Sequence, residues 1–421
     1  MKNISAIILA AGDCSRFYPF NDSHKSLINI MGKPILEHTL TSIKDSGIKD
    51  VIIVSSDNDV ENVLGNGENL GLNIKYVLQK KSTGMGDALL LAGPYVESDF
   101  FLIHPYHVDF CKFKDRMLSA KKNSSDIILL AKKITGSIAL RKTGVLKLNG
   151  EKVIEVVEKP ALGTEPSDLG VIGIYLLNKL FIENLRQTPK DHYSFEKSIS
   201  SFAKKADIRF TVTALENVSL KYPWEILNLK DHLLKNLKKY TAVSAGVASS
   251  AQICDEVYID EGAKIMENAT VKGPCYIGKN AYVGNNAILR QGVDLEENSV
   301  IGANMEFKNT LMMENSKVHS GFIGDSVIGK NCRIGAGFNT ANVRLDRMSV
   351  KVAVKNEKID TGLKSLGVLV GDGSVIGIKS SSMPGKIIGK RVIVGSNTCI
   401  SKNIADDSKY YTKFQEIIEE K

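Results

Sequence analysis

The chain has 421 residues with 43% hydrophobic and 24% charged content, which is typical of a globular protein of about two or three domains and excludes a disordered or fibrous chain. Its net charge of +8 is mild and unclustered, so it is compatible with phosphorylated substrates and argues against a nucleic-acid partner. The six cysteines are scattered, and no apolar run reaches the roughly 20 residues of a membrane-spanning helix, so we expect a reduced cytoplasmic protein without a membrane partner.

Apolar strands alternate with helices along the first half of the chain. Residues 6–9 form a continuous apolar run, as expected of a buried parallel strand, and a glycine-containing loop follows. A helix is predicted from Pro34 to about Ser46, where Gly47 ends it. Further strands are expected at 51–54, 74–78, 100–103, 153–157 and 173–177, with a helix at 85–92. This order predicts an α/β nucleotide-binding domain.

An amphipathic helix is predicted at 223–239, because four of its leucines lie on or near one face. We place the end of the first domain directly after this helix, so that the first domain spans residues 1–240. The tail, residues 406–421, is predicted to be a C-terminal helix that covers the open end of the second domain and its strand edges.

Aliphatic residues recur at a spacing of six at nine positions: Ile253, Ile259, Ile265, Val271, Ile277, Val283, Leu289, Leu295 and Ile301. A strand repeats every two residues and a helix about every 3.6, so this period fits neither. It fits a coil with three flat sides per turn, each side contributing one inward side chain. The period returns at Ile328 and Ile334 and again between 370 and 400. An ordinary β-sandwich with coincidental spacing is the alternative, and the nine matches favour a parallel β-helix over residues 248–405.

The loop after the first strand has the composition of a phosphate-binding site. Small residues at Ala10, Ala11 and Gly12 let backbone amides approach a phosphate, and Arg16 supplies a neutralising cation. Lys25 adds a second cation a short way along the chain. A glycine loop alone is weak evidence for such a site, so the prediction depends on the motifs that accompany it.

Those motifs give the chain a family resemblance. They are, in order, Leu9 to Arg16, Lys25, Gly32-Lys33-Pro34, Gln79, Gly84-Met85-Gly86-Asp87, Gly144, Glu158-Lys159-Pro160 and Gly173. Residues 5–235 resemble the sugar-1-phosphate nucleotidylyltransferases. With the repeat, the whole chain resembles the archaeal form of the bifunctional N-acetylglucosamine-1-phosphate uridylyltransferase/glucosamine-1-phosphate acetyltransferase type. The resemblance implies a Rossmann-like nucleotidyltransferase domain followed by a left-handed parallel β-helix of hexapeptide repeats.

The resemblance also implies roles for residues of the first domain. A sugar phosphate oxygen would attack the α-phosphate of a nucleoside triphosphate, and pyrophosphate would leave. The nucleotide would be held by Leu9, Ala10, Ala11, Gly12, Arg16, Lys25, Gln79 and Gly84. The sugar phosphate would be held by Gly144, Glu158, Lys159 and Gly173. Phosphoryl chemistry of this kind depends on positioning and charge neutralisation, so Mg²⁺ is expected as a cofactor.

The metal ligands depart from the family pattern. The family places one aspartate after the strand at 100–103 and another before the Pro-Trp turn, and this chain has His107 and Ser219 at those positions. Because Mg²⁺ prefers carboxylates, Asp109 is a candidate replacement: it would point to the same side as His107 if the strand continued. Asn217 stands in the same relation to Ser219. The candidate ligands are therefore Asp109, His107 and Asn217.

A second site is implied within the repeat. His319 lies in residues 318–326, which match the acyltransferase stretch, and it would take a proton from a sugar amine as the amine attacks the thioester of acetyl-CoA. The resemblance adds Arg290, Glu306, Lys308, Ala336 and Asn342 to this site. Where the family usually has Tyr, Asn and Lys, the chain has Phe322, Arg333 and Ser365. Arg333 could bind phosphate in place of the missing lysine, and Lys364 adjoins Ser365.

The leading interpretation is a cytoplasmic, homotrimeric enzyme of nucleotide-sugar synthesis that uses an NTP, a sugar 1-phosphate and acetyl-CoA. Two alternatives stay open. One is a binding or regulatory protein with a reduced first site, like the regulatory subunits of mannose-1-phosphate guanylyltransferase. The other is an acyltransferase whose first domain only binds substrate. The substitutions at 107 and 219 favour the alternatives, whereas the retained cations and Glu158 favour the enzyme.

Overall fold

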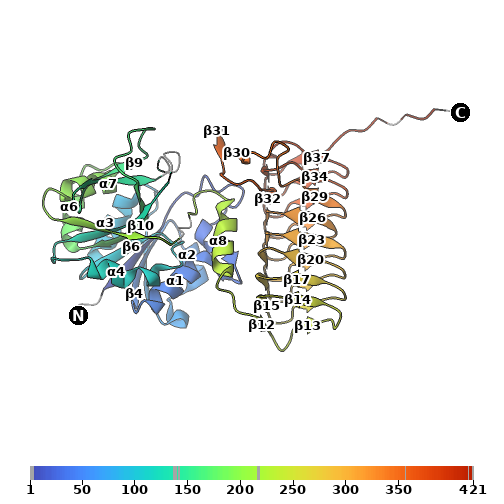
Figure 1. Ribbon diagram of the computed structural model, residues 1–421, viewed down its shortest axis with the longest axis horizontal. Coiled ribbons are helices and arrows are strands. Elements are labelled where there is room, and N and C mark those ends of the chain that lie inside the picture. Colours follow the sequence, from blue (N-terminus) through green and yellow to red (C-terminus); the bar gives the residue numbers. More distant parts are fainter. Residues whose placement is uncertain are drawn as a thin grey trace. The chain divides into compact units, whose positions relative to one another are not determined.

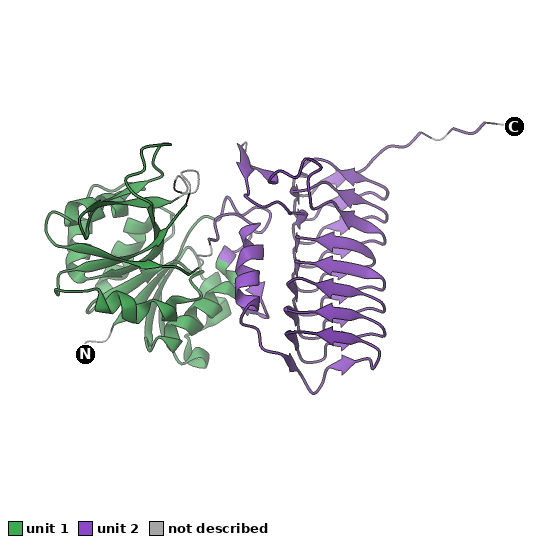
Figure 2. Ribbon diagram, in the orientation of Figure 1, with its two compact units in different colours: residues 1–13, 26–28, 34–217 green, residues 14–25, 29–33, 218–421 purple. Residues whose placement is uncertain are grey.

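The computed structural model describes residues 4–135, 140, 143–215, 219–355, 357–415 and 417–419. The chain divides into two compact units, shown in different colours in Figure 2: residues 1–13, 26–28 and 34–217, and residues 14–25, 29–33 and 218–421. The predicted order of an α/β domain and a β-helix is confirmed. The division itself falls near residue 217, ahead of the predicted end at 240, because the helix predicted at 223–239 groups with the second unit.

A mixed sheet forms the centre of the first unit, in the order β11-β7-β10-β6-β1-β4-β5, with the hairpin β8–β9 beside β10 (Figure 1). The strands are β1 Ser5–Ala10, β4 Asp50–Ser55, β5 Asn73–Leu78, β6 Phe100–Ile103, β7 Ile127–Lys133, β8 Gly144–Asn149, β9 Lys152–Glu158, β10 Leu169–Leu177 and β11 Ile208–Thr213. Strands β5, β4, β1 and β6 are parallel, and β10 is antiparallel to both β6 and β7. The parallel strands therefore bring their carboxyl ends to one edge.

Both faces of this sheet are buried, which explains the continuous apolar runs in the sequence. Successive residues alternate between two cores: Ile7 belongs to one cluster and Ile8 to the other. The helices of this unit are α1 Ile35–Asp45, α2 Asp59–Leu64, α3 Met85–Ala92, α4 Lys114–Ser119, α6 Lys179–Arg186 and α7 Ser194–Phe202. The strands predicted at 51–54, 74–78 and 100–103 and the helix at 85–92 are confirmed within a residue or so at each end.

Three parallel sheets form the β-helix of the second unit. The first sheet contains β12 Tyr240–Thr241, β15 Val257–Ile259, β18 Cys275–Ile277, β21 Val293–Leu295, β24 Leu311–Met312, β27 Val327–Ile328, β32 Val368–Val370 and β35 Lys386–Ile388. The second contains β13 Gly246–Val247, β16 Lys264–Ile265, β19 Tyr282–Val283, β22 Val300–Ile301, β25 Lys317–Val318, β28 Arg333–Ile334, β33 Val375–Ile376, β36 Ile393–Val394 and β38 Lys409–Tyr410. The third contains β14 Gln252–Cys254, β17 Thr270–Lys272, β20 Ile288–Arg290, β23 Met305–Lys308, β26 Gly321–Gly324, β29 Phe338–Thr340, β34 Ser381–Ser382 and β37 Cys399–Ile400.

The six-residue period corresponds to one side of a coil. Val257 pairs with Cys275, 18 residues later, so a regular coil has three sides of six residues. The predicted inward residues between Ile259 and Ile301 all lie in one apolar core that runs along the inside of the coil. Each fully buried aliphatic side chain of this kind contributes about 1.5–3 kcal/mol, so the repeat itself stabilises the coil.

Some coils are shorter where the sequence period fails. Met305 pairs with Gly321 and Leu311 with Val327, only 16 residues later. The inward core positions there are Ile301, Phe307, Met312, Val318, Ile323 and Ile328, so three of the five steps have five residues. These tightened corners explain why the period is lost after 301 and returns at 328, and they lie in the stretch that carries the candidate acyl site.

Two segments of the second unit differ from a plain coil. After β29 the chain leaves the coil, forms the hairpin β30 Lys351–Val354 and β31 Glu357–Asp360, and returns at β32. Helix α8 spans Glu225–Leu234, which is shorter than the predicted 223–239, because Leu237 leaves the helix and packs with Tyr276. Among the described residues, no helix is both long and apolar enough to cross a membrane.

The helix predicted at 406–421 is wrong for the described part of the tail. Lys409–Tyr410 form strand β38 beside β36, and Tyr410 packs against the β-helix core, so the coil continues where a helix was expected. Residues 411–415 and 417–419 have no regular structure. The spacing of apolar residues in the tail resembled one face of a helix. Residues with this spacing can instead form a strand that pairs with an open strand edge.

Candidate active sites

The predicted phosphate loop begins at the carboxyl edge of the first unit's sheet. Strand β1 contains Leu9 and ends at the buried Ala10; Ala11 is 5% exposed, and Gly12 is exposed. A Cβ atom at Gly12 would meet no atom within 4 Å, so there is open space beside this residue. The two predicted cations follow in residues 14–25, where Arg16 is exposed.

Lys25 is held by contacts within the second unit. Its Nζ donates a hydrogen bond to the carbonyl oxygen of Leu220 at 2.6 Å and lies 5.8 Å from the centroid of the Phe17 ring. These contacts hold the ammonium group of Lys25 in place.

The predicted base-binding turn is preorganised by Gln79. This side chain is 4% exposed and follows β5, and its Nε2 donates to Thr83 Oγ1 at 3.2 Å and to Asp87 Oδ2 at 3.1 Å. Asp87 accepts from Thr83 as well, and this hydrogen bond lowers the pKa of the Asp87 carboxyl. Gly84 precedes α3 with a φ of +112°, and a Cβ there would lie 2.8 Å from the carbonyl oxygen of His192. Only glycine fits this position.

Three of the four predicted sugar-phosphate residues lie on or directly after the hairpin β8–β9. Gly144 pairs with Glu158 across the hairpin, and a Cβ at Gly144 would lie 2.9 Å from Glu158 Oε2. The glycine therefore leaves room for the carboxylate. Lys159 is exposed and adopts a φ of +49° directly after the strand, so its side chain leaves the hairpin in a different direction from a strand residue.

Glu196 of α7 is a partly buried acidic residue that sequence reasoning missed. Burial, followed by the nearby carboxylate of Glu158, raises the pKa of Glu196, and its Oε2 is buried without a hydrogen-bond partner. Tyr175 of β10 is affected by both carboxylates, and burial raises the pKa of its hydroxyl well above the usual value. Two carboxylates around a tyrosine suit the hydroxyl groups of a sugar. In the sequence, the only signal at this position is the helical spacing of the apolar residues around Glu196. That spacing gives no indication of the glutamate's role.

His107 stands where the resemblance places a metal-binding aspartate. Strand β6 ends at Ile103, and the following loop stacks the rings of His104 and Tyr106, with His107 against both. His107 is 5% exposed, and burial, followed by the charge of His104, lowers its pKa to about 3. Its Nε2 is buried without a hydrogen-bond partner. The imidazole is therefore neutral at physiological pH.

Gly173 is required by this histidine cluster. It sits at an irregularity between β10 and β7 and has a φ of +81°. A Cβ at Gly173 would lie 2.4 Å from His104 Cδ2 and 3.4 Å from His107 Nε2. The glycine that was assigned to the sugar phosphate therefore also accommodates the imidazole rings.

The argument that placed Asp109 beside His107 fails, because it required the strand to continue. The chain turns after Ile103, and Asp109 Oδ1 forms an ion pair with Lys112 at 2.5 Å before a short 3-10 helix at Phe110–Lys112. Ser219 donates a hydrogen bond to Glu225 Oε2 at 3.2 Å, and Asn217 lies outside the described residues. Within the described part of the chain, no three His, Cys, Asp or Glu side chains are grouped as metal ligands would be. These residues do not fit Mg²⁺, which prefers hard oxygen ligands.

Four of the predicted acyl-site residues form a polar cluster on the third sheet. Arg290 Nε donates to Glu306 Oε1 at 2.7 Å, and its Nη2 lies 2.6 Å from the same oxygen. Lys308 is the strand neighbour of Arg290 and forms an ion pair of 2.9 Å with Asp325. Asn342 also donates to Asp325, at 2.5 Å. The two cations therefore lie side by side on adjacent coils.

Three further predicted acyl-site residues lie in turns or loops of the second unit. His319 is exposed in the turn between β25 and β26, and its backbone amide is held by the carbonyl oxygen of Ile334 at 2.9 Å. Ala336 lies in the turn after β28, and Lys364 is exposed at the return of the chain to the coil. The imidazole of His319 is thus accessible to a substrate, as a general base must be.

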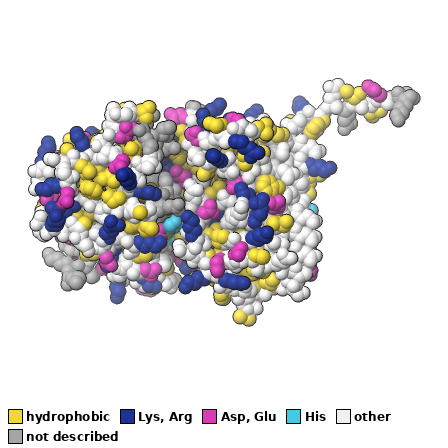
Figure 3. All heavy atoms as spheres, viewed as in Figure 1, with side chains coloured by type: hydrophobic (Ala, Val, Ile, Leu, Met, Phe, Trp, Pro, Cys, Tyr) yellow, Lys and Arg dark blue, Asp and Glu magenta, His cyan; other side chains and the backbone are white. Residues whose placement is uncertain are grey.

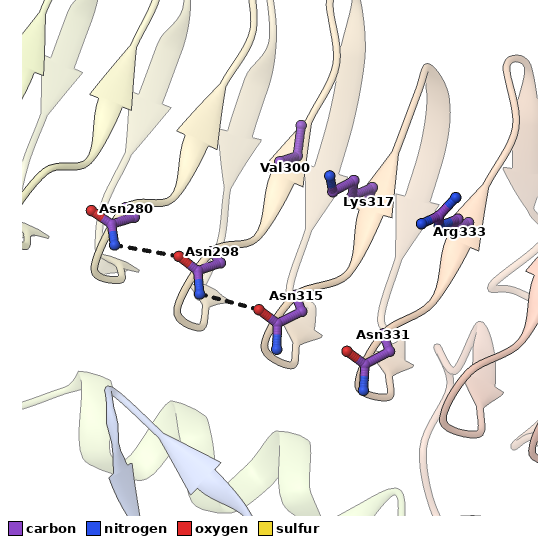
Figure 4. Close-up of a pocket in the computed structure, with 7 residues that line it drawn as sticks. All are labelled: Asn280, Asn298, Val300, Asn315, Lys317, Asn331 and Arg333. Carbon is purple, nitrogen blue, oxygen red and sulfur yellow. Dashed lines mark hydrogen bonds between the residues drawn. The ribbon is translucent and has the colours of Figure 1, made fainter.

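Arg333 lies on a different sheet from the cluster. It lines an open pocket of about 350 Å³ on the second sheet together with Lys317, its strand neighbour, and Val300 (Figure 4). Along the adjoining corner, four asparagines also line the pocket, and two hydrogen bonds of 3.3 and 3.1 Å link Asn280 to Asn298 and Asn298 to Asn315. Two cations without a lining carboxylate suit a phosphate, and phosphate binding by Arg333 stays a prediction.

Comparison with known proteins extends over the whole chain. The family described as nucleotidyl transferase matches residues 5–215, and the family described as GMPPB C-terminal domain matches residues 271–410. The "Bifunctional protein GlmU" of Methanococcus maripaludis is 32% identical over 99% of this chain and 100% of that protein. The "Bifunctional sugar-1-phosphate nucleotidylyltransferase/acetyltransferase" of Sulfurisphaera tokodaii is 28% identical over 95% of this chain and 98% of that protein. Together with the loop, hairpin and coil described above, these matches place the chain in the nucleotidyl transferase family and, over its full length, among the archaeal GlmU-type bifunctional proteins.

Proposed function

We propose that the protein is a bifunctional enzyme of nucleotide-sugar synthesis. Its first unit transfers a nucleotidyl group from an NTP to a sugar 1-phosphate, and its second unit transfers an acetyl group from acetyl-CoA to an amino-sugar phosphate. The observation that carries this proposal is the full-length similarity to a bifunctional protein GlmU and to a protein whose name includes both activities. The preorganised Gln79 turn and the Gly144–Glu158 pair support the first activity.

In the first reaction, an oxygen of the sugar 1-phosphate attacks the α-phosphorus of the NTP, and the bond to the β-phosphate oxygen breaks to release pyrophosphate. Arg16 and Lys25 neutralise phosphate charge, while backbone amides near Gly12 approach the phosphates. Glu158 accepts hydrogen bonds from sugar hydroxyls, and Lys159 binds the sugar phosphate. A divalent cation is expected for such a reaction, but the donors at His107 do not match it, so none of these steps depends on a protein-bound cation.

In the second reaction, the amine of an amino-sugar phosphate attacks the thioester carbon of acetyl-CoA, and the sulfur leaves with its electron pair. His319 accepts the amine proton, which is the role of a general base. Arg290 and Lys308 hold the sugar phosphate, and Arg333 with Lys317 offers a second place for phosphate charge.

We also propose that the protein acts in the cytoplasm as a homotrimer built through the β-helix. All six cysteines are free thiols, in keeping with a reducing compartment. The Lys and Arg side chains are dispersed over the face visible in Figure 3, which fits small phosphorylated substrates better than a nucleic acid.

A second candidate function is favoured by one observation. A buried, neutral His107 stands in place of a metal-binding carboxylate. A first unit that only binds a nucleotide sugar, and does not make one, would tolerate this replacement. In that case, the protein is an acetyltransferase with a binding or regulatory first unit.

One experiment distinguishes the two functions. The full chain is incubated with a panel of nucleoside triphosphates and sugar 1-phosphates, with and without Mg²⁺, and pyrophosphate release is measured. Acetyl transfer from acetyl-CoA to glucosamine 1-phosphate is measured in parallel. The bifunctional proposal requires both products. Acetyl transfer without pyrophosphate release from any pair would support the second function, and an absence of both would overturn both.

A further inference from the structure

Asp325 is the buried centre of a polar network beside the candidate acyl site. The residue is 3% exposed. Its carboxylate accepts hydrogen bonds from Lys308 Nζ at 2.9 Å, Asn309 Nδ2 at 2.9 Å and Asn342 Nδ2 at 2.5 Å. An ionised carboxylate only accepts hydrogen bonds, so each neighbour must turn a donor toward it. Motif matching identified Lys308 and Asn342 and assigned no role to Asp325.

The network extends to a lysine that is fully buried in α8. Lys230 is 0% exposed; its Nζ donates to Asn309 Oδ1 at 2.9 Å and to the carbonyl oxygen of Gly292. A lysine only donates and a carboxylate only accepts, so the amide of Asn309, which lies between them, has a single orientation. Asn309 and Asp325 both occupy tightened corners of adjacent coils, with φ values of +44° and +51°. The hydrogen bonds of the network therefore all point the same way, from Lys230 through Asn309 to Asp325.

The groups held by Asp325 lie beside Gly324, where neighbouring side chains are closely packed. Gly324 is the strand neighbour of Lys308 and has no side chain. A Cβ atom at Gly324 would lie 2.7 Å from Phe322 Cζ and 3.0 Å from Asn342 Nδ2. Lys308 uses one donor on Asp325 and keeps two for a ligand, and Asn342, with its NH₂ group turned to Asp325, presents its Oδ1 elsewhere.

We propose that Asp325 is a positioning residue of the acyl-acceptor site. It holds the ammonium group of Lys308, whose side chain is 22% exposed, so that this group binds a phosphate of the acceptor. It also fixes the Asn342 amide so that its oxygen accepts a hydrogen bond from an N–H or O–H of the acceptor. The proposal rests on the acetyltransferase function proposed above and adds the requirement that the acceptor carries both an anion and a hydrogen-bond donor. Asn309 and Lys230 keep Asp325 in this orientation.

The test is Asp325→Asn in the full chain. The amide keeps the shape of the carboxylate but removes its charge, and it lets Asn342 turn over. We expect the kcat/KM for acetylation of glucosamine 1-phosphate to fall about 10- to 100-fold, with KM raised, because a charged buried hydrogen bond is lost. The matched control is Asp407→Asn, which alters another corner aspartate, with a φ of +57° and an ion pair to Arg391, and should leave acetyl transfer unchanged.

A swap variant separates positioning from a purely structural role. Asp325→Asn combined with Asn342→Asp restores a carboxylate–amide hydrogen bond with the partners exchanged. We expect thermal stability to recover in this variant while kcat/KM stays low, because Lys308 and the acceptor now face the wrong groups. Recovery of both stability and activity would show that Asp325 is only structural and would overturn the proposal.

Binding of glucosamine 1-phosphate, followed by calorimetry, keeps this test separate from the proposed function. If the wild-type protein binds the sugar phosphate but does not acetylate it, the acetyltransferase function fails, and a weaker affinity of Asp325→Asn still supports positioning. If the wild-type protein acetylates and Asp325→Asn has the same KM and kcat, the positioning proposal fails alone. If the wild-type protein neither binds nor acetylates the sugar phosphate, both fail.

Discussion

At position 107, a buried imidazole replaces the hard oxygen ligand that the family resemblance implies. The replacement changes the chemistry of the sheet edge, because the neutral ring packs at a tilt against His104 and Tyr106, and Gly173 provides space for the imidazole rings. Asp109 does not compensate, since its carboxylate is paired with Lys112. By the roles that the family resemblance implies, the chain therefore keeps the residues for phosphate and sugar, whereas a position expected to bind the cation has changed.

The double substitution His107→Asp with Ser219→Asp tests this view. It restores the two carboxylates of the family, so Mg²⁺-dependent pyrophosphate release should increase at least about tenfold, the factor that about 1.4 kcal/mol of barrier lowering supplies. The rate is measured across a Mg²⁺ titration. His192→Asp is the matched control, because His192 is exposed and lies outside the cluster. A double variant no faster than the wild-type protein would count against this account of the cation site.

Asp109→Asn addresses the remaining carboxylate. Because Asp109 is paired with Lys112 and the strand ends before it, we expect its loss to change the rate of pyrophosphate release by less than about threefold, in line with the small contribution of a surface ion pair. Complete loss of Mg²⁺-dependent release would instead identify Asp109 as the metal ligand that the sequence analysis proposed.

His319→Ala tests the general base of the second unit. General-base catalysis contributes about 10²- to 10⁴-fold, so acetyl transfer should fall by that factor. Nucleotide binding, measured by calorimetry with an NTP, should be unchanged, because His319 belongs to the β-helix. Phe322→Ala is a useful comparison, since it alters the same coil without removing a base. Unchanged acetyl transfer in His319→Ala would show that another group takes the proton.

At the scale of elements, the short segment that contains Met31 and Gly32 is anchored by two buried carboxyl groups of the β-helix. One belongs to strand β21 and the other directly follows it. Asp294 Oδ2 accepts from the backbone N–H of Met31 at 2.9 Å, and Glu296 Oε1 accepts from Gly32 at 3.1 Å. Burial raises the pKa of Asp294 to about 7 and raises the pKa of Glu296 well above its usual value. The pair thus shares protons up to near-neutral pH.

This pair predicts that the protein loses stability as the pH rises. The folded protein binds more protons than the unfolded chain between the unfolded pKa, near 4, and the folded pKa of Asp294, about 7. Stability is therefore greatest on the acidic side of this window and falls by on the order of 2–4 kcal/mol as the pH rises through it. Urea unfolding of the full chain at pH 5, 6, 7 and 8 measures the slope.

Asp294→Asn should flatten that slope and raise stability at pH 8, because an amide keeps an acceptor for Met31 without a buried charge. Asp346→Asn is the control: Asp346 is exposed, and the hydrogen bond from Arg344 lowers its pKa to about 2, outside the window. Equal slopes in the wild-type protein and Asp294→Asn would contradict the assignment.

At the scale of the whole molecule, the sequence predicted what local periodicity determines. The β-helix followed from a period of six, because each aliphatic residue has the same inward environment. The tightened corners between Ile301 and Ile328 could not be predicted, since a five-residue side depends on how neighbouring coils pair. For the same reason, Asp325 and Glu196 went unassigned: their importance comes from neighbours that are distant in sequence. The tail was predicted wrongly because its strand pairs with β36, which local pattern does not reveal.

The β-helix exposes apolar side chains that a homotrimer would cover. Val375 and Ile393 are strand neighbours on the second sheet and are 42% and 48% exposed, and Ile378 in the following turn is 50% exposed. Contiguous exposed apolar residues mark interaction surfaces, and one flat side of each of three coils can face a common three-fold axis. We therefore expect multi-angle light scattering to give three times the chain mass at micromolar concentration.

Val375→Lys with Ile393→Lys should convert the trimer into monomers, because six lysines would meet at three equivalent interfaces without carboxylate partners. Val243→Lys, at a position that is fully exposed and lies near the start of the coil, is the control and should remain trimeric. If each acyl site is completed by a neighbouring copy, acetyl transfer should be lost together with the trimer, while pyrophosphate release by the first unit persists. A wild-type protein that is monomeric at micromolar concentration would contradict the assembly, and a monomeric variant with full acetyl transfer would show that each coil carries a complete site.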